Sequence, residues 1–322
     1  MNAAVLQTLG KPPRYGQFPE PVTRKDEVMI HVHAASLKPI DKQLADGSHY
    51  AGFRELPVVC GIDGVGSLDD GKRVFFGGPR QPYGSMAERT VVSPSRCFPL
   101  PDNIDDDVAA AIFNPGLSAW GSLVWRAQLQ PGETVLILGA TGVTGKLAIQ
   151  TARLLGAGRI VAAGRNEDVL RTLPDLGADA TIRLNEPGQD LAEAFAHAAG
   201  EHGFDVTIDY LWGPPTEALL SAITQRNLTS ATSRMRLVEV GETAGSTISL
   251  PAAALRSSRL EILGAGTGSA SASPEMWAEA IKQLMANVAS GKLHIDTERI
   301  PLSDVEEAWQ RDQHGRRLVF TM

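Results

Sequence analysis

Three glycines in one short turn are the strongest sign of chemistry in this sequence. Gly139, Gly142 and Gly145 follow an apolar run at residues 134–138 and precede a stretch with helical apolar spacing. Such glycines let backbone N–H groups approach a pyrophosphate, and the positive end of a helix dipole favours its charge. The pattern predicts a dinucleotide-binding turn, although a plain tight turn is the alternative, because the spacing departs from GxGxxG. The residues expected to contact the dinucleotide here are Thr141, Gly142, Val143 and Thr144.

The next apolar run, at residues 159–163, ends in Gly164, Arg165 and Asn166. An NAD-specific site places an Asp or Glu at this point to bind the ribose 2′-hydroxyl, and no carboxylate stands there. A glycine leaves room for a 2′-phosphate, and the Arg165 guanidinium can pair with it. The sequence therefore favours NADPH over NADH, with a solvated arginine as the alternative.

A turn of this kind needs alternating strands and helices around it. After about residue 116, short apolar runs at 134–138, 159–163, 180–184, 205–209 and 237–240 alternate with helix-like segments. This alternation predicts a doubly wound parallel sheet of the Rossmann type. Up to about residue 95, short β-like runs are instead separated by Gly and Pro, which predicts a compact, mostly β unit. The fold class is therefore α/β.

Composition excludes several function classes. The 322 residues include 30 Lys and Arg against 37 Asp and Glu, a net charge of −7, without a basic run. This argues against binding nucleic acid or an anionic membrane. Cys60 and Cys97 are too few for a secreted disulfide framework, and no long apolar segment or leader pattern is present. We expect a cytoplasmic protein.

A series of short motifs runs through the chain in a fixed order. They are Pro39-Ile-Asp41, Leu56-Pro-Val-Val-Cys-Gly61-Ile-Asp63-Gly-Val-Gly66, Tyr83-Gly-Ser-Met-Ala-Glu88, Gly116-Leu-Ser118-Ala, the glycine-rich turn, Leu176-Gly-Ala-Asp179 and Pro301-Leu-Ser-Asp-Val-Glu-Glu-Ala308. Together they resemble the medium-chain dehydrogenase/reductase superfamily, in its zinc-independent quinone oxidoreductase (zeta-crystallin-like) branch. The resemblance implies a Rossmann domain (117–258) inserted in a GroES-like β domain (1–116 and 259–322).

The resemblance also bears on metal binding. Zinc-dependent relatives carry a Cys and a His ligand at the positions of Lys38 and Ile62, and neither residue present here can ligate a metal ion. The resemblance therefore implies no catalytic metal. An unrelated zinc site built from His31, His33, His49 and Cys60 is the weaker alternative.

Without zinc, oxidation of an alcohol is disfavoured, because no Lewis acid stabilises the alkoxide. A quinone or an α,β-unsaturated carbonyl is already electrophilic, so its reduction needs only positioning and stabilisation of the developing oxyanion. The resemblance places Lys38 and Tyr50 in the substrate cleft as donors, with Asp41 orienting the turn or Lys38. An ion pair between Lys38 and a nearby carboxylate is the alternative. At the place where many relatives have a Lys supporting the 2′-phosphate, this chain has Asp168.

The resemblance implies further contacts with the cofactor, and these are Ser118, Leu211, Val240, Gly241, Gly266, Thr267 and Gly268. The expected function is NADPH-dependent, zinc-independent reduction of quinones or reactive enones by hydride transfer. The alternatives are an alkenal/enone double-bond reductase without quinone activity and a non-catalytic, redox-sensing NADPH-binding protein. The resemblance also implies a homodimer joined through the sheet edge at residues 260–263.

Overall fold

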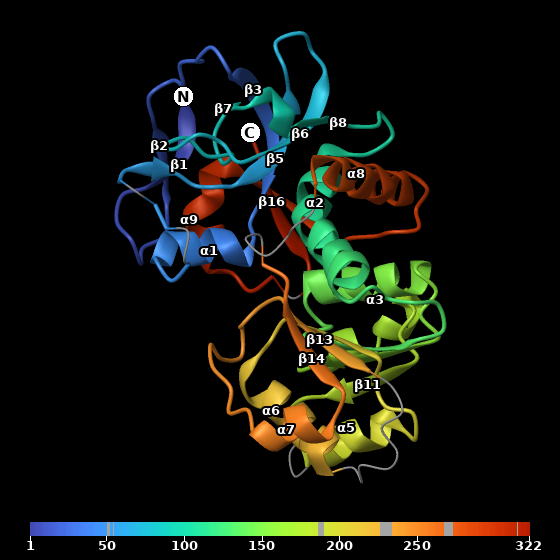
Figure 1. Ribbon diagram of the computed structural model, residues 1–322. Coiled ribbons are helices and arrows are strands. Elements are labelled where there is room, and N and C mark those ends of the chain that lie inside the picture. Colours follow the sequence, from blue (N-terminus) through green and yellow to red (C-terminus); the bar gives the residue numbers. More distant parts are fainter. Residues whose placement is uncertain (50–51, 54, 186–189, 226–233, 267–272, 314) are drawn as a thin grey trace. The chain divides into compact units, whose positions relative to one another are not determined.

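The chain forms two units, one inserted in the sequence of the other (Figure 1). The computed structural model describes residues 1–322 except 50–51, 54, 186–189, 226–233, 267–272 and 314. Unit 1 consists of Met1–Asn114 and Met285–Met322, and unit 2 of Pro115–Leu284. The structure returns to unit 1 later than the predicted residue 259, because β14 (Leu260–Gly264) pairs with the sheet of unit 2.

Unit 1 is built mainly from antiparallel strands. Among the described residues, a seven-stranded sheet has the order β15-β16-β3-β5-β6-β8, with β7 paired to β3. β15 and β16 pair in parallel, whereas β3 pairs antiparallel with its neighbours. The bounds are β3 (Val28–Ser36), β5 (Asp63–Ser67), β6 (Arg73–Gly77), β7 (Arg89–Val92), β8 (Cys97–Pro99), β15 (Thr297–Pro301) and β16 (Arg317–Thr321).

A second, three-stranded sheet of unit 1 has the order β2-β1-β4. Buried apolar side chains, among them Leu6, Met86 and Phe320, form one core cluster of this unit. Removing such side chains from water is the main contribution to the stability of the unit. The remaining elements are β1 (Asn2–Leu6), β2 (Arg14–Gln17), β4 (Val58–Val59), α1 (Pro39–Asp46), α9 (Val305–Gln310) and the short 3-10 turns Pro94–Arg96 and Leu302–Asp304.

Unit 2 contains a parallel sheet of six described strands in the order β11-β10-β9-β12-β13-β14. Its strands are rich in buried Val, Ile and Leu, as expected for strands covered on both faces. The bounds are β9 (Thr134–Leu138), β10 (Arg159–Gly164), β11 (Ala180–Arg183), β12 (Val206–Asp209) and β13 (Met235–Glu239). The five predicted apolar runs all form strands of this sheet, and the predicted fold class is confirmed.

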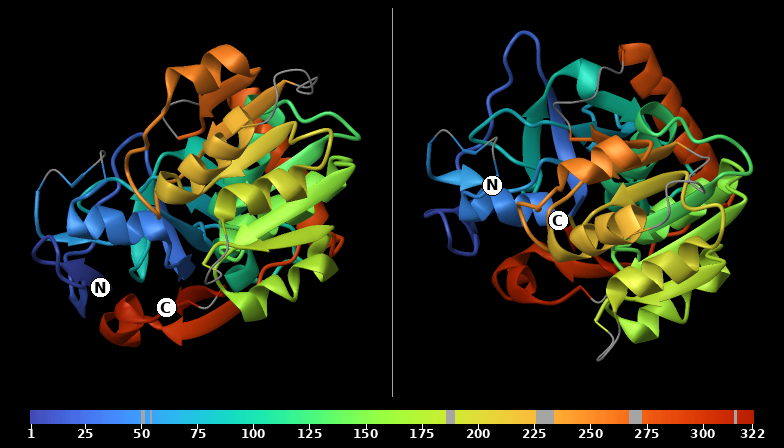
Figure 2. Two further views of the ribbon diagram at one scale, coloured as in Figure 1. Left: turned by 90° about the horizontal axis from the view of Figure 1, so that it is seen from below. Right: turned by 60° about the horizontal axis from the view of Figure 1, so that its bottom comes forward.

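Helices connect these strands and run alongside the sheet (Figure 2). They are α3 (Val143–Leu154), α4 (Glu167–Leu170), the 3-10 turn Leu173–Leu176, α5 (Leu191–Ala199), α6 (Gly213–Gln225) and α7 (Ala252–Ser257). α2 (Asp106–Trp120) leads from unit 1 into unit 2 and continues as a π-helix at Gly121–Arg126, and α8 (Pro274–Ala289) leads back. None of the described helices is both long and apolar enough to cross a lipid bilayer.

The order of the strands reverses at β9, since β10 lies on one side of it and β12 on the other. In open α/β sheets, ligands bind at the carboxyl ends of the strands at such a switch point. The glycine-rich turn follows β9 directly. The fold therefore places the turn where a dinucleotide is expected to bind.

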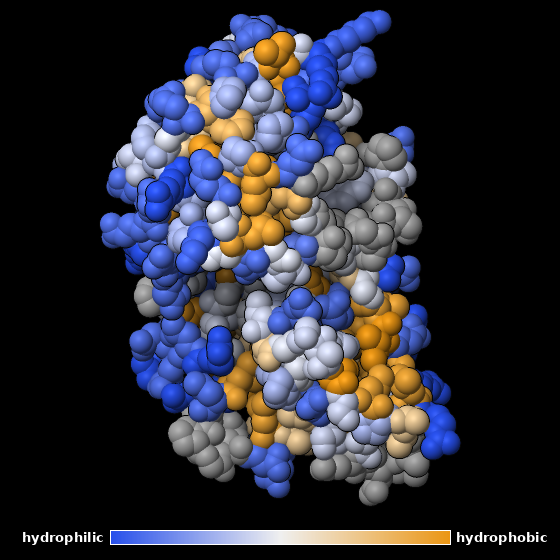
Figure 3. All heavy atoms as spheres, turned by 90° about the vertical axis from the view of Figure 1, so that its left-hand side faces the viewer, coloured by the Kyte–Doolittle hydropathy of each residue, from blue (hydrophilic) through white to orange (hydrophobic). Residues whose placement is uncertain are grey.

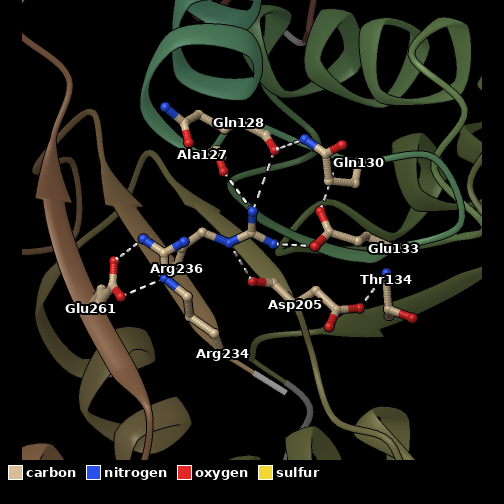
Figure 4. A network of polar contacts seen from close by, with 9 residues as sticks. All are labelled: Ala127, Gln128, Gln130, Glu133, Thr134, Asp205, Arg234, Arg236 and Glu261. Atoms are coloured by element: carbon tan, nitrogen blue, oxygen red, sulfur yellow. Dashed lines mark hydrogen bonds and ion pairs between the residues drawn. The ribbon is translucent and has the colours of Figure 1, made fainter.

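A buried arginine fixes the opposite, amino-terminal end of the same sheet (Figure 4). Arg236 on β13 forms an ion pair with Glu133 and donates a hydrogen bond to the carbonyl of Ala127 at 2.7 Å. Its backbone N–H donates to the carbonyl of Asp205, whose carboxylate accepts from the N–H of Thr134 at 2.8 Å. These bonds tie the starts of β9, β12 and β13 together.

Candidate cofactor site and buried charge cluster

The glycine-rich turn has the geometry of a phosphate cradle. Gly139 has φ +86°, a conformation that only glycine adopts readily. A Cβ atom on Gly145 would lie 2.3 Å from the carbonyl oxygen of Gly139, so α3 packs directly on the turn. Gly142 is the N-cap of α3 and supplies no side-chain acceptor, so the N–H groups of Val143 and Thr144 lack a cap. These N–H groups can bind a pyrophosphate at the positive end of the helix dipole.

Gly164 ends β10 beside this turn, and close packing alone already requires a glycine there. A Cβ atom on Gly164 would lie 2.4 Å from Cγ2 and 2.8 Å from Oγ1 of Thr141. The missing side chain therefore makes room for Thr141. The predicted space for a 2′-phosphate beside Gly164 stays a prediction.

Arg165 and Asn166 extend from the end of β10 in different ways. Arg165 is exposed, and its guanidinium makes no hydrogen bond or ion pair with the described residues, so it is available to an anion. Asn166 is the N-cap of α4, and its side chain accepts a hydrogen bond from the N–H of Val169 at 3.2 Å. Its amide oxygen is therefore already engaged within the protein. Asp168 lies on the exposed face and pairs with Arg171.

The carboxyl end of β12 carries a fixed loop on the other side of the switch point. The buried Asp209 carboxylate accepts hydrogen bonds from the N–H groups of Leu211 at 2.8 Å and Trp212 at 2.9 Å. It also accepts one from the hydroxyl of Thr216 on α6 at 2.5 Å. Burial raises the pKa of Asp209, whereas these donors lower it. Asp209 thus holds the loop that carries Leu211 against the Gly139 turn.

Sequence reasoning did not single out Asp209 or its neighbour Tyr210 at this end of the sheet. The signal available for Asp209 was a carboxylate at the end of a buried strand, followed three and four residues later by Trp212 and Gly213. In the structure both of these residues adopt positive φ. Nothing in the sequence distinguished Tyr210. Its backbone carbonyl accepts a hydrogen bond from Thr243, and it lies between Gly139 and Gly241.

The other predicted cofactor residues lie in the same unit. Val240 and Gly241 follow β13, and their N–H groups both donate to the carbonyl of Asp209, at 2.8 and 3.2 Å. Ser118 is half-buried on α2, and Gly266 is exposed after β14. Their contacts with a cofactor stay predictions. Thr267, Gly268 and Tyr50 lie outside the described residues.

Unit 1 holds a buried cluster of four charged side chains. Lys38 precedes α1, Asp41 lies in its first turn, Asp63 begins β5 and Arg317 begins β16. Lys38 Nζ lies 2.9 Å from Asp63 Oδ1 and 3.4 Å from Asp41 Oδ2, and it donates to the carbonyl of Ser36 at 3.0 Å. We call Lys38, Asp41, Asp63 and Arg317 the buried charge cluster. It ties α1 to two strands that are distant in sequence.

The pKa values in the cluster reflect burial and mutual attraction. Burial alone would lower the pKa of Lys38, but the Asp41 and Asp63 carboxylates raise it above its ordinary value. Burial raises the pKa of Asp41 and lowers that of Arg317 to about 10. The Lys38 side chain is 1% exposed, and its ammonium donates hydrogen bonds to Ser36 and Asp63 and forms an ion pair with Asp41. The ion pair considered as the alternative is therefore present, and the predicted role of Lys38 as an oxyanion donor stays a prediction.

Comparisons with known proteins agree with this geometry. A family described as "Zinc-binding dehydrogenase" matches residues 143–286. The quinone oxidoreductase of Rattus norvegicus is 30% identical over 199 residues, which cover 59% of this chain and 59% of that protein. The chloroplastic NADPH-dependent alkenal/one oxidoreductase of Arabidopsis thaliana is 32% identical over 193 residues, 54% of this chain and 50% of that protein. The match thus spans between half and three-fifths of the length of these curated relatives.

The family description names zinc, but the residues at the ligand positions do not fit a metal ion. Lys38 presents an ammonium that is held by two carboxylates, and Ile62 presents an alkyl group. Burial raises the pKa of the neighbouring Cys60 thiol, which disfavours the thiolate form that binds metals. The described residues include no group of three His, Cys, Asp or Glu side chains that could hold a metal ion. His31 and His33 instead bond to Asp69 and Asp106.

Solved structures extend the likeness over the whole chain. The quinone oxidoreductase of Thermus thermophilus, a structure described alone and in complex with NADPH, has a TM-score of 0.83 and 27% sequence identity. The alignment covers 100% of both chains. The inserted six-stranded parallel sheet and the glycine-rich turn at its switch point agree with these matches. The chain is similar to members of the medium-chain dehydrogenase/reductase superfamily, in its quinone oxidoreductase-like branch.

Proposed function

We propose that this chain is an NADPH-dependent reductase of quinones or reactive enones that works without a metal ion. The observation that carries the proposal is the end of β10, where Arg165 stands exposed without a partner among the described residues, next to the uncapped first turn of α3. A 2′-phosphate suits this arginine, whereas no carboxylate is present for a 2′-hydroxyl. The names of the Arabidopsis and Thermus proteins support the choice of NADPH.

The chain's own residues would bind and orient the cofactor. The N–H groups of Val143 and Thr144 would hold the pyrophosphate, and Arg165 would hold the 2′-phosphate. Asp209 fixes the loop with Leu211 on the other side of β9, against which the nicotinamide half can pack. Bound NADPH supplies a hydride. Because a quinone or enone is already electrophilic, this transfer needs positioning and oxyanion stabilisation rather than a Lewis acid.

Two substrate classes fit the proposal, and the relatives are divided between them: the rat protein is named for quinones and the Arabidopsis protein for alkenals and enones. The test is a fluorescence titration with NADPH, followed by assays with benzoquinone, naphthoquinone and an alkenal, each with and without a chelator. Turnover of either class that survives the chelator supports the proposal. Binding without turnover would favour a redox-sensing protein, and loss of turnover on chelation would contradict metal independence.

We also propose that two copies of the chain pair through β14. This strand ends the described sheet of unit 2, and no described strand pairs with its outer edge. The Ala265 N–H and the Arg259 carbonyl both bond to β13, so by alternation the N–H groups of Leu260 and Ile262 face outward. In the view of Figure 3, apolar side chains gather in several patches, on the upper part of the face as well as on the lower part. A second copy of β14 would satisfy these outward groups.

Sedimentation velocity tests the dimer. Ile262→Pro removes one outward N–H and no bond to β13, and we expect it to shift the protein from dimer to monomer. Ile262→Val is the matched control and should remain dimeric. A wild-type protein that sediments as a monomer would refute the pairing. The cytoplasmic location stays a prediction.

A further inference from the structure

A second arginine, Arg183, lies near Arg165 at the carboxyl end of the sheet, and the proposed function does not use it. Arg183 is the last residue of β11, which pairs in parallel with β10. In this pairing Arg183 is the partner of Gly164, and the N–H of Leu184 donates a hydrogen bond to the Gly164 carbonyl at 2.9 Å. Neighbouring strands lie about 4.8 Å apart, so Arg183 starts one strand spacing away from the residue that precedes Arg165.

The register of the two strands decides to which face the Arg183 side chain points. Residues that pair across parallel strands point to the same face of the sheet. A Cβ atom on Gly164 would lie 2.4 Å from Cγ2 of Thr141, which belongs to the glycine-rich turn. The Arg183 side chain therefore leaves β11 on the face where this turn packs. It is 34% exposed, so an anion from solvent can reach it.

The Glu167 carboxylate holds Arg183 at this end of the sheet. Glu167 is the first residue of α4, and it accepts a hydrogen bond from Nη1 of Arg183 at 2.8 Å. Because Glu167 comes two residues after Arg165, this bond brings the Arg183 guanidinium to the segment that carries Arg165. Both partners are partly exposed, and an exposed ion pair of this kind is weak. A more highly charged anion can therefore replace the carboxylate.

The charge of a phosphate monoester calls for more than one arginine. Such a group carries between about 1.5 and 2 negative charges at pH 7 and has three strong acceptor oxygens. Arg165 supplies one positive charge, so a second guanidinium would complete the balance. Arg171 suits this role less well, because it is 66% exposed and pairs with both Glu167 and Asp168 on its own helix. Arg183 projects from the sheet itself, on the face of the glycine-rich turn.

We propose that Arg183 is a second arginine for the 2′-phosphate of NADPH, and that Glu167 competes with the phosphate for it. The inference rests on the proposed function, because it presumes that NADPH binds with its 2′-phosphate at Arg165. When the phosphate binds, the Arg183 guanidinium exchanges its ion pair with Glu167 for one with the phosphate. NADH lacks this group, so Arg183 keeps its carboxylate partner when NADH binds.

Two substitutions test the proposal, because it requires them to act in opposite directions. Calorimetric titration of the full chain measures the affinities for NADPH and NADH. Arg183→Gln removes the guanidinium, and we expect it to weaken NADPH binding at least about fivefold. Glu167→Gln releases the guanidinium, and we expect it to strengthen NADPH binding about two- to fivefold. Both variants should leave NADH binding unchanged within about twofold.

Arg171→Gln and Asp168→Asn are the matched controls. They remove one charge of each sign from α4, where the two side chains pair with each other at 3.1 Å. Each should change either affinity by less than about twofold, because exposed charges are screened by salt.

Three results would each overturn the inference while the proposed function stands. They are unchanged NADPH affinity in Arg183→Gln, weakened NADPH binding in Glu167→Gln, and an effect of Arg171→Gln as large as that of Arg183→Gln. An equal change in NADH affinity would also overturn it, because the contact would then not be with the 2′-phosphate. If the wild-type chain binds no NADPH, the proposed function itself fails, and the inference fails with it.

Discussion

The buried charge cluster allows a sharp test of whether Lys38 serves structure or chemistry. Lys38→Met keeps the length of the side chain and removes its charge. The Asp63 carboxylate, 2.9 Å from Nζ, then loses its partner, and Asp41 loses one as well. Breaking a buried ion pair from one side costs about 3–5 kcal/mol, because the remaining charge is left uncompensated. For a unit of this size, each kcal/mol lowers the melting temperature by about 2–4 °C, so we expect a fall of about 6–20 °C.

Calorimetry measures this change, and two further variants control it. Lys72→Met removes an exposed lysine that also pairs with an aspartate, and it should leave the melting temperature unchanged. The double variant Lys38→Met/Asp63→Asn removes the stranded charge and should recover part of the loss. A Lys38→Met protein that melts like the wild type but has lost its kcat would refute the structural interpretation. It would restore Lys38 as a donor to the substrate.

Three further predictions follow from other sites. Arg165→Gln should weaken NADPH binding at least about tenfold without changing NADH binding, because only the 2′-phosphate contact is lost. Competitive titrations measure both affinities, and an unchanged affinity for NADPH would show that this arginine is merely solvated. Gly145→Ala should abolish dinucleotide binding or folding, because the alanine Cβ would lie 2.3 Å from the carbonyl oxygen of Gly139. A folded variant that binds NADPH with wild-type affinity in a fluorescence titration would contradict this close packing. Burial raises the pKa of Asp107, but hydrogen bonds from Arg299 and Thr297 hold that pKa below its ordinary value. The Asp107 carboxylate therefore stabilises the fold above about pH 4, and this contribution is lost on further acidification. Asp107→Asn should make the urea midpoint depend less on pH between about pH 5 and 3, and an unchanged pH dependence would contradict this account.

The parts of the fold that follow local patterns could be predicted from the sequence. Each apolar run of unit 2 became a strand because runs of buried β-branched residues between turn signals have few other solutions. The Gly139 turn could also be predicted, because the contacts that require a glycine there come from residues close to it in the sequence. The position at which the chain returns to unit 1 was harder to predict. The short apolar run at Leu260–Gly264 does not itself show which of the sheets it joins.

Contacts between distant residues limited the prediction of the site. The sequence could not show that Lys38 meets Asp63 and Arg317, because only the fold brings these three together. It also could not show that Thr141 fills the space beside Gly164. The cap formed by Asn166 was within reach, because an Asn followed by two acidic residues is a common start of a helix.

The packing of Thr141 against Gly164 also constrains how the proposed preference for NADPH could change during evolution. A carboxylate at the end of β10 would need the volume that the threonine methyl group already fills. A single Gly164→Asp exchange would therefore disturb the phosphate turn before any gain in NADH binding could appear. The viable route begins with a smaller residue in place of Thr141, so the two positions are epistatic and the order of mutations matters.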